Sequence, residues 1–470
     1  MAVATCRARA GRAGSWWRAV QFTPPIRIMS PPLRHERIPM IRSYRVCLCS
    51  WLACVALGGC VSNEPWPSEL NYHETQILLR WEPVATNDDM NSVLSLVHGK
   101  VRRSYQILQE LVLVEIDLDF ISIEKARSKL AEQGQFVRYA EHNYFVRSLD
   151  TPNDEFYSRQ WNMENTGGDV GPFPGLIGAD IQAEDGWDLF TGNAEFVIAV
   201  IDSGVQLDHP DLECNIWVND GETLDGTDTD ENGYRDDIRG WDFVMRDNHP
   251  DDPEGHGTHV AGIIGAIGDN GMGVAGVNWN CKLMPLRFIG SGRGLISDAI
   301  AALEYAVLKG VRVSCNSWGD DDYSQALEDA IFEAGERDHI FVTSAGNRQK
   351  NIDVEPVYPA SLNLENIITV ASVDHRDELA PKSNWGEVSV DIAAPGVYVL
   401  STSNDSDYQV LSGTSMAAAH VAGVVAMLMA HRPKMTAMEV REKVLASARD
   451  VGLGSFIQTG GVVSLLEALK

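Results

Sequence analysis

Five short, mostly apolar runs between residues 196 and 373 constrain the fold more than any other feature: FVIAVID, KLMPLRFI, VRVSCNS, HIFVTSA and IITVASV. Runs of this length without regular polar alternation indicate strands that are covered on both faces. Helical stretches such as SDAIAALEYAVLKG separate them, and a capping-box pattern at Thr436 and Glu439 predicts the start of the last long helix. Strands that alternate with helices predict an α/β fold with a doubly wound, mostly parallel sheet.

Three polar residues stand at the ends of apolar elements, where sites gather in such sheets. Asp202 ends the run FVIAVID, His256 opens the helix in GHGTHVAGIIGA, and Ser415 opens the helix in LSGTSMAAAHVAG. By itself Ser415 also fits a helix cap. Together the three residues meet the needs of acyl transfer, because an imidazole takes the proton of the serine and a carboxylate fixes the imidazole tautomer.

A donor for the oxyanion is also present. Asn347 in FVTSAGN follows another buried strand behind a small Ala–Gly turn, and the backbone N–H of Ser415 would be a second donor. His259 lies three residues after His256 and raises the alternative of a metal pair. No third ligand follows at metal-binding spacing and the HExxH pattern is absent, so we expect His259 to be structural.

These motifs carry a resemblance to a known family. Asp202 in DSG, His256 in HGTHVAG, Asn347 in SAGN and Ser415 in GTSMA are similar to the motifs of subtilisin-like serine proteases, in that family's order of Asp, His and Ser. The resemblance covers residues 152–470. It implies a serine endopeptidase that hydrolyses polypeptide substrates through an acyl-enzyme intermediate.

The resemblance also implies substrate contacts. NSWG resembles the segment that pairs with the substrate backbone as a strand, and GSGRG resembles the opposite rim; the residues concerned are Ser317, Trp318, Gly319, Gly290 and Gly292. Recognition through main-chain pairing implies broad specificity. VYPAS is similar to the family's cis-proline turn, which makes Tyr358–Pro359 a candidate cis bond.

An acidic loop between Asp202 and His256 predicts a structural calcium ion. DTDENG follows the D-x-D-x-N-G spacing of a calcium loop, although Arg239 stands where an EF-hand has its closing Glu. The expected ligands are Asp228, Asp230, Asn232, Asp236 and Asp237. The alternative is a solvated acidic loop. The resemblance implies a second calcium site, with the ligands Asp154, Asp211 and Asn270.

The N-terminal segment has the layout of an export signal. Residues 40–60, MIRSYRVCLCSWLACVALGGC, place two Arg before an apolar run and small residues. The apolar run is shorter than the roughly 20 residues that span a bilayer. LGGC resembles the lipobox of bacterial lipoproteins, in which Cys60 would carry the lipid; an ordinary signal peptide is the alternative. Residues 1–39 fit neither part and are either an extension or the result of a start site placed too far upstream.

Charge limits the partners of this chain. Nine Arg and one Glu give residues 1–60 a formal charge of +8. Because the whole chain has a formal charge of −28, residues 61–470 together carry −36. Such a body repels phosphate, which argues against nucleic acid as a partner. We expect an extracytoplasmic protein that contacts a membrane only through a lipid on Cys60.

The segment before the catalytic part resembles an inhibitory pro-region. After a linker at 61–74, residues 75–148 have a compact α+β pattern, and SLDTPNDE forms a polar joint suited to cleavage between about Arg147 and Asp154. The pro-domain would inhibit its own protease, whereas a permanent accessory domain is the alternative. A catalytically silent, protease-like binding protein would typically lack one of the four motif residues. An esterase of the α/β-hydrolase type would need G-x-S-x-G and the order Ser, Asp, His.

Overall fold

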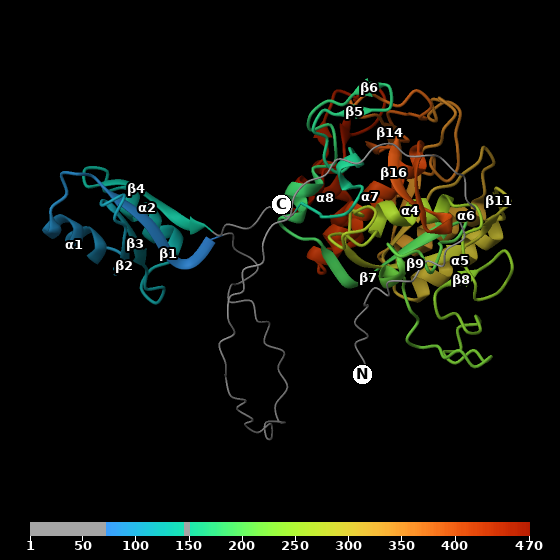
Figure 1. Cartoon of the computed structure of the whole chain (residues 1–470), viewed down its shortest axis with the longest axis horizontal. Helices are drawn as coiled ribbons and strands as arrows, with labels where there is room; N and C mark the ends of the chain where they lie inside the picture. Colours follow the sequence, from blue (N-terminus) through green and yellow to red (C-terminus); the bar gives the residue numbers. More distant parts are fainter. Residues whose placement is uncertain (1–71, 145–150) are drawn as a thin grey trace, which may run out of the picture. The chain divides into compact units, whose positions relative to one another are not determined.

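The computed structural model describes residues 72–144 and 151–470. The chain divides into two compact units, Met1–Val146 and Arg147–Lys470, and each is described by itself (Figure 1). The predicted export signal and lipidation site at Cys60 lie outside the described residues.

The first unit is a four-stranded antiparallel sheet with two helices, which is an α+β architecture. The sheet has the order β2-β3-β1-β4, with β1 Tyr72–Trp81, β2 Lys100–Ser104, β3 Leu111–Glu115 and β4 Val137–Tyr144. The helices are α1 Asn87–Ser95 and α2 Ile123–Ala131. Ile77, Leu79 and Trp81 alternate along β1 and are buried in a core that Ala126 and Leu130 of α2 complete.

The second unit is built on a nine-stranded sheet. Its order is β18-β19-β15-β14-β13-β12-β7-β9-β8. The strands are β7 Gly192–Asp202, β8 Trp241–Asp242, β9 Asn280–Arg287, β12 Val313–Asn316, β13 Ile340–Ser344, β14 Ile367–Val373, β15 Ile392–Pro395, β18 Arg449–Asp450 and β19 Gly461–Val462. Only the β18–β19 pair in this sheet is antiparallel, so the predicted mostly parallel sheet is confirmed.

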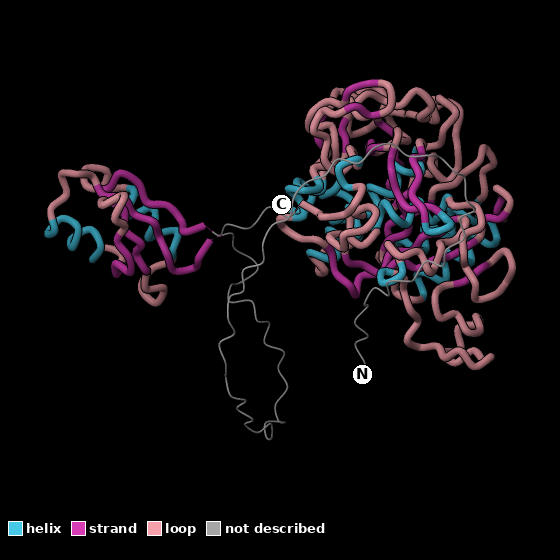
Figure 2. Tube along the Cα trace, viewed as in Figure 1, coloured by secondary structure: helices cyan, strands magenta, loops and turns pink. Residues whose placement is uncertain are grey.

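Helices cover both faces of this sheet, as the apolar character of its strands requires (Figures 1 and 2). In β7, Ile198 and Val200 join the core under α4 His256–Gly265 and α7 Thr414–His431. The alternate residues Ala199 and Ile201 join the opposite core. That core lies under α5 Ile296–Leu308 and α6 Gln325–Gly335.

Helix α7 is the central helix of the unit. It is long and apolar enough to cross a membrane, but 94% of it is buried inside the domain. Small residues allow close packing there, since a Cβ on Gly423 would lie 2.8 Å from Val277. The next helix, α8 Ala437–Ala446, begins at the predicted capping box, in which Thr436 and Glu439 cap each other's backbone N–H groups.

Smaller elements complete the second unit. They are the helices α3 Ala183–Trp187 and α9 Leu465–Leu469, the hairpins β5 Asp169–Val170 with β6 Phe173–Pro174, β10 Ile289–Gly290 with β11 Arg293–Gly294, and β16 Val399–Ser403 with β17 Asp407–Leu411, and the 3-10 turns η1 Tyr157–Arg159, η2 Glu213–Asn215 and η3 Asn404–Ser406. The Tyr358–Pro359 peptide bond is cis, as expected from the sequence.

Candidate active site

Asp202 and His256 form a hydrogen-bonded pair. Asp202 is the last residue of β7 and is fully buried, whereas His256 is the first residue of α4 and its side chain is 35% exposed. His256 Nδ1 lies 2.7 Å from Asp202 Oδ1, which also accepts the N–H of Ser203 at 2.7 Å. The Asp202 carboxylate raises the pKa of His256 to about 9. This pair therefore leaves Nε2 of the imidazole free to exchange a proton.

A glycine makes the approach of these two elements possible. A Cβ on Gly257, the second residue of α4, would lie 2.1 Å from the carbonyl oxygen of Gly204. Any larger residue would push the first turn of α4 away from the loop that follows Asp202, so the Gly in HGTH is a packing requirement.

Ser415 is the second residue of α7 and is only 7% exposed. Its hydroxyl donates to the carbonyl oxygen of Ser317 at 3.4 Å. Among the described residues, the hydroxyl makes no hydrogen bond to His256. Catalytic hydrogen bonds are often long or unformed without substrate, and a change in χ1 redirects a serine hydroxyl. The backbone N–H of Ser415 belongs to the first turn of α7, where N–H groups have no partner within the helix.

Asn347 is held by the start of the same helix. Its Oδ1 accepts the N–H of Thr414 at 2.9 Å and the Thr414 hydroxyl at 3.2 Å, and that hydroxyl accepts the N–H of Gly346 at 3.1 Å. Because these bonds occupy the amide oxygen, the Nδ2 group of Asn347 remains as a donor.

A cavity of about 350 Å³ adjoins these groups. It is lined by Ser317, Trp318, Gly319, Ser344, Gly346, Asn347, Arg348, Val357, Asn384 and Ser415. The structure thus brings the segment predicted to bind the substrate backbone to the same cavity as Ser415 and Asn347. Sequence reasoning did not find Asn384, whose buried amide donates to the carbonyl oxygen of Ala345 at 2.8 Å.

Gly290 and Gly292, predicted as the opposite rim, lie on the β10–β11 hairpin and do not line that cavity. The hairpin is tied to the region of His256, because both carboxylate oxygens of Glu254 lie 3.1 Å from the N–H of Gly292. The rim and the imidazole are therefore linked through a residue two positions before His256.

His259 is interior, in agreement with the structural role expected for it. It is fully buried, and its Nε2 lies 3.1 Å from the carbonyl oxygen of Gln409 in β17. Burial lowers its pKa to about 4, so the imidazole is neutral at physiological pH.

A serine beside a helix N-terminus, an Asp–His pair and a free amide donor make up the set of groups that a serine hydrolase uses. The subtilase family profile matches residues 193–462. The chain belongs to the subtilase family and is a subtilisin-like serine endopeptidase.

Individual relatives agree with this assignment. The chain is 34% identical over 339 residues to the thermophilic serine proteinase of Bacillus sp. (strain AK1), covering 72% of this chain and 74% of that protein. It is 35% identical over 280 residues to thermitase of Thermoactinomyces vulgaris, covering 59% and 85%. Among solved structures, it is similar to a protease from Pseudoalteromonas arctica PAMC 21717, with a TM-score of 0.53 and 28% identity, covering 68% of this chain and 99% of that chain.

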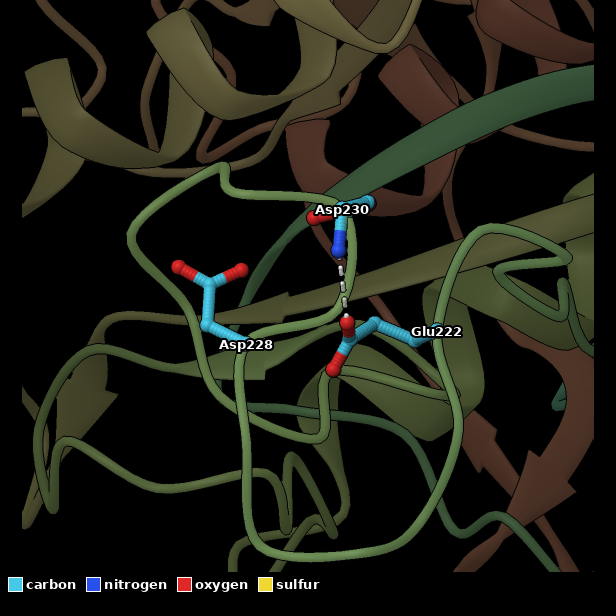
Figure 3. Close-up of side chains that lie close together, drawn as sticks. All are labelled: Glu222, Asp228 and Asp230. Carbon is cyan, nitrogen blue, oxygen red and sulfur yellow. Dashed lines mark hydrogen bonds between the residues drawn. The ribbon is translucent and has the colours of Figure 1, made fainter.

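Three carboxylates gather on the acidic loop, within 4.8 Å of one another: Glu222, Asp228 and Asp230 (Figure 3). Glu222 Oε1 accepts the N–H of Asp230 at 3.1 Å, and its Oε2 accepts the N–H of Asp236 at 2.7 Å. Backbone donors thus hold Glu222 in place. Carboxylate oxygens at this separation suit calcium, which prefers hard oxygen ligands.

The expected ligand set differs from this cluster. Glu222 was not predicted, because it precedes the D-x-D-x-N-G pattern and only the fold of the loop brings it near. Asp236 Oδ1 instead accepts the N–H groups of Asp225 and Gly226, both at 2.9 Å. The Nδ2 group of Asn232 donates to Asp237 at 2.7 Å, and its Oδ1 accepts the N–H of Tyr234.

Asp237 is part of a buried network that adjoins the Glu222 cluster. It accepts hydrogen bonds from Asn219 at 2.8 Å and from the Tyr305 hydroxyl, and the Lys309 ammonium lies 3.8 Å away. Lys309 also donates to Asp230. A cation bound by the Glu222 cluster must therefore share Asp230 with Lys309.

The second predicted calcium site consists of residues that lie close together in the fold. Asn270 Nδ2 donates to Asp211 Oδ1 at 2.7 Å, and the N–H of Asp269 donates to Asp154 Oδ2 at 2.7 Å. Burial raises the pKa of Asp154 and raises that of Asp211 to about 7. Asp154 Oδ1 is buried without a hydrogen-bond partner. An orphaned carboxylate oxygen beside a second buried carboxylate fits a cation.

Proposed function

We propose that this chain is an exported endopeptidase that cleaves polypeptides with Ser415 as nucleophile, His256 as general base and Asp202 as the residue that orients the imidazole. The 2.7 Å bond between His256 and Asp202 is the observation that carries the proposal. It places a proton acceptor of defined tautomer at the start of α4, while Ser415 and Asn347 line one cavity.

The geometry supports the following chemistry. His256 Nε2 takes the proton of the Ser415 hydroxyl as its oxygen attacks the scissile carbonyl, and Asp202 stabilises the imidazolium that forms. Asn347 Nδ2 and the N–H of Ser415 donate to the oxyanion. The imidazolium then gives its proton to the leaving amine, which leaves an acyl-enzyme on Ser415. Attack by water, with His256 again as base, releases the acid product.

Labelling with a fluorophosphonate probe and casein hydrolysis test this proposal. The parental protein should be labelled at Ser415 and should cleave casein, whereas Ser415→Ala should do neither while keeping its thermal midpoint. Ser412→Ala is the matched control, since within residues 72–144 and 151–470 its hydroxyl bonds only the N–H of Tyr398. A parental protein that neither reacts nor cleaves would instead favour a catalytically silent binding protein.

The second part of the proposal is that the protease is synthesised as a zymogen that cleaves itself. The α+β unit at 72–144 precedes the catalytic unit, as an inhibitory pro-domain would. The expected cut between about Arg147 and Asp154 falls partly on residues outside the described ones. A lipid on Cys60 would stay with the pro-domain, so cleavage would release the protease unless the two pieces remain bound.

Mass spectrometry of membrane and soluble fractions tests processing and release together. The parental protein should yield a soluble fragment that starts near Thr151, and Ser415→Ala should accumulate uncut on the membrane. Uncut chains in both proteins would contradict the zymogen. A cut chain that stays on the membrane would contradict only the release.

Structural calcium is the third part of the proposal. Glu222, Asp228 and Asp230 would hold one ion. Asp154 and Asp211 would hold another near Asn270. Bound calcium would neutralise carboxylates that repel one another and would tie these loops to the catalytic domain.

A further inference from the structure

Asp252 is a buried carboxylate that the proposed chemistry does not use. It lies four residues before His256 and is 6% exposed. Five hydrogen bonds converge on it. Their donors are the N–H groups of Glu254, Gly255 and Thr258 and the hydroxyls of Ser203 and Thr258, at 2.8 to 2.9 Å. A buried carboxylate with this many donors is held rigidly in place.

Four of these bonds hold the start of helix α4, and the one from the N–H of Thr258 caps its first turn. The residue at the N-cap position is Gly255, which has no side chain to satisfy the N–H groups of the first turn. Asp252 replaces that missing cap, with Oδ1 on Glu254 and Gly255 and Oδ2 on Thr258. Its negative charge also lies at the positive end of the helix dipole. Asp252 therefore sets the start of the helix whose first residue is His256.

The fifth bond connects Asp252 to the segment that carries Asp202, the partner of His256. Ser203, which directly follows Asp202, donates its hydroxyl to Asp252 Oδ1 at 2.9 Å and accepts the N–H of Gly257 at 3.0 Å. The end of β7 and the first turn of α4 are thus joined by one hydrogen-bond network centred on Asp252.

We infer that Asp252 is a positioning residue that holds Asp202 and His256 in register through Ser203 and the cap of α4. This inference rests on the proposed function. Catalytic groups must be held to within about half an ångström of their working geometry, and an error of about 1 Å costs about a hundredfold in rate. A carboxylate that bonds both supporting segments supplies that constraint.

Asp252 also contributes to the field at His256. The ionisable groups that bear on this imidazole are Asp202 at the end of β7, Asp252 and Glu254 before α4, and His259 one turn later. Asp202 has the largest effect in raising the pKa of His256, burial opposes it, and Asp252 and Glu254 raise it further. Removal of the charge on Asp252 should therefore lower the pKa of His256.

Steady-state kinetics normalised to sites titrated with a fluorophosphonate test this role. Asp252→Ala should lower kcat by about tenfold or more with KM within about twofold, because positioning acts on the chemical step. Asp252→Asn should recover part of kcat, since its amide oxygen still accepts from Ser203 and Gly255. In both variants the acidic limb of kcat/KM should move to lower pH. Ser203→Ala should also lower kcat, and its effect should not add to that of Asp252→Ala.

Asp391→Asn is the matched control. Asp391 is also a buried carboxylate, bonded by the N–H of Thr369 at 2.7 Å and paired with Arg441, but it lies outside the site. The Asp391→Asn protein should have a lower thermal midpoint than the parental protein and the same kcat per titrated site. Asp252→Asn with parental kcat per site and an unmoved pH limb would overturn the inference. A parental protein without labelling or activity would instead refute the proposed function.

Discussion

Thr414 holds the amide oxygen of Asn347 with its backbone N–H, at 2.9 Å, and with its hydroxyl, at 3.2 Å. Thr414 is the first residue of α7 and Ser415 is the second. A single helix start therefore positions both the proposed nucleophile and the amide that would donate to the oxyanion.

Asn347→Ala should lower kcat by about a hundredfold or more while KM changes little, because the amide would act mainly on the charge of the transition state. Thr414→Val keeps the backbone donor and loses only the hydroxyl, so its kcat should fall less. Initial rates on a peptide substrate measure both values. A change confined to KM in Asn347→Ala would contradict the role proposed for this amide.

Activity should increase with pH as His256 loses its proton. Asp202 raises the pKa of His256 to about 9 from the usual value near 6.5, so the imidazole keeps its proton to higher pH. A protonated imidazole is not a base, so kcat/KM should rise with pH through a midpoint above 6.5. A pH profile measured from pH 5 to 10 shows the midpoint. A midpoint below pH 6 would mean that the Asp202 carboxylate does not govern this titration.

Calcium should stabilise the catalytic domain by mass action, since it would bind the folded state. The thermal midpoint in millimolar calcium should exceed that in EGTA. Asp228→Ala and Asp154→Ala should each remove part of the difference, because they belong to separate sites. Glu231→Gln, in the same loop but outside the Glu222 cluster, should retain it. Equal midpoints of the parental protein in calcium and EGTA would leave DTDENG as a solvated loop.

Acid should destabilise the fold partly through His339. This imidazole is fully buried, with Nε2 at 2.8 Å from the Ser314 hydroxyl and Nδ1 at 2.8 Å from the Val311 carbonyl oxygen. Burial lowers its pKa to about 4. The unfolded chain therefore binds more protons between pH 6.5 and 4, so stability falls as pH decreases through this window, by about 3 kcal/mol for one such group.

Urea unfolding of the parental protein and His339→Gln at pH 4.5 and pH 7 measures this contribution. The loss of stability between the two pH values should be smaller in the variant, whatever its stability at pH 7. An equal loss in both proteins would show that His339 does not titrate in this range.

Local patterns in the sequence determined the sheet, the order of the motifs and the family. A strand buried on both faces must be apolar along its length, and Asp202 stands at the end of such a strand. His256 and Ser415 stand in the first turns of two apolar helices. The parallel topology leads us to expect these residues at the same edge of the sheet. The capping box at Thr436 was predictable because it depends on a few adjacent residues. The cis bond before Pro359 was expected from the family resemblance of VYPAS.

Only the tertiary structure decided which polar side chains support these groups. Glu222 joins Asp228 and Asp230 through the folding of a loop, and Thr414 reaches Asn347 across 67 positions of the chain. In the sequence, nothing distinguishes Asp252 from the many other acidic residues. In the fold, its carboxylate accepts five hydrogen bonds from two segments of the chain. Hydrogen bonds between distant segments produce no periodic pattern in the sequence. They depend on where the folded backbone places each side chain and not on the neighbouring residues in the chain.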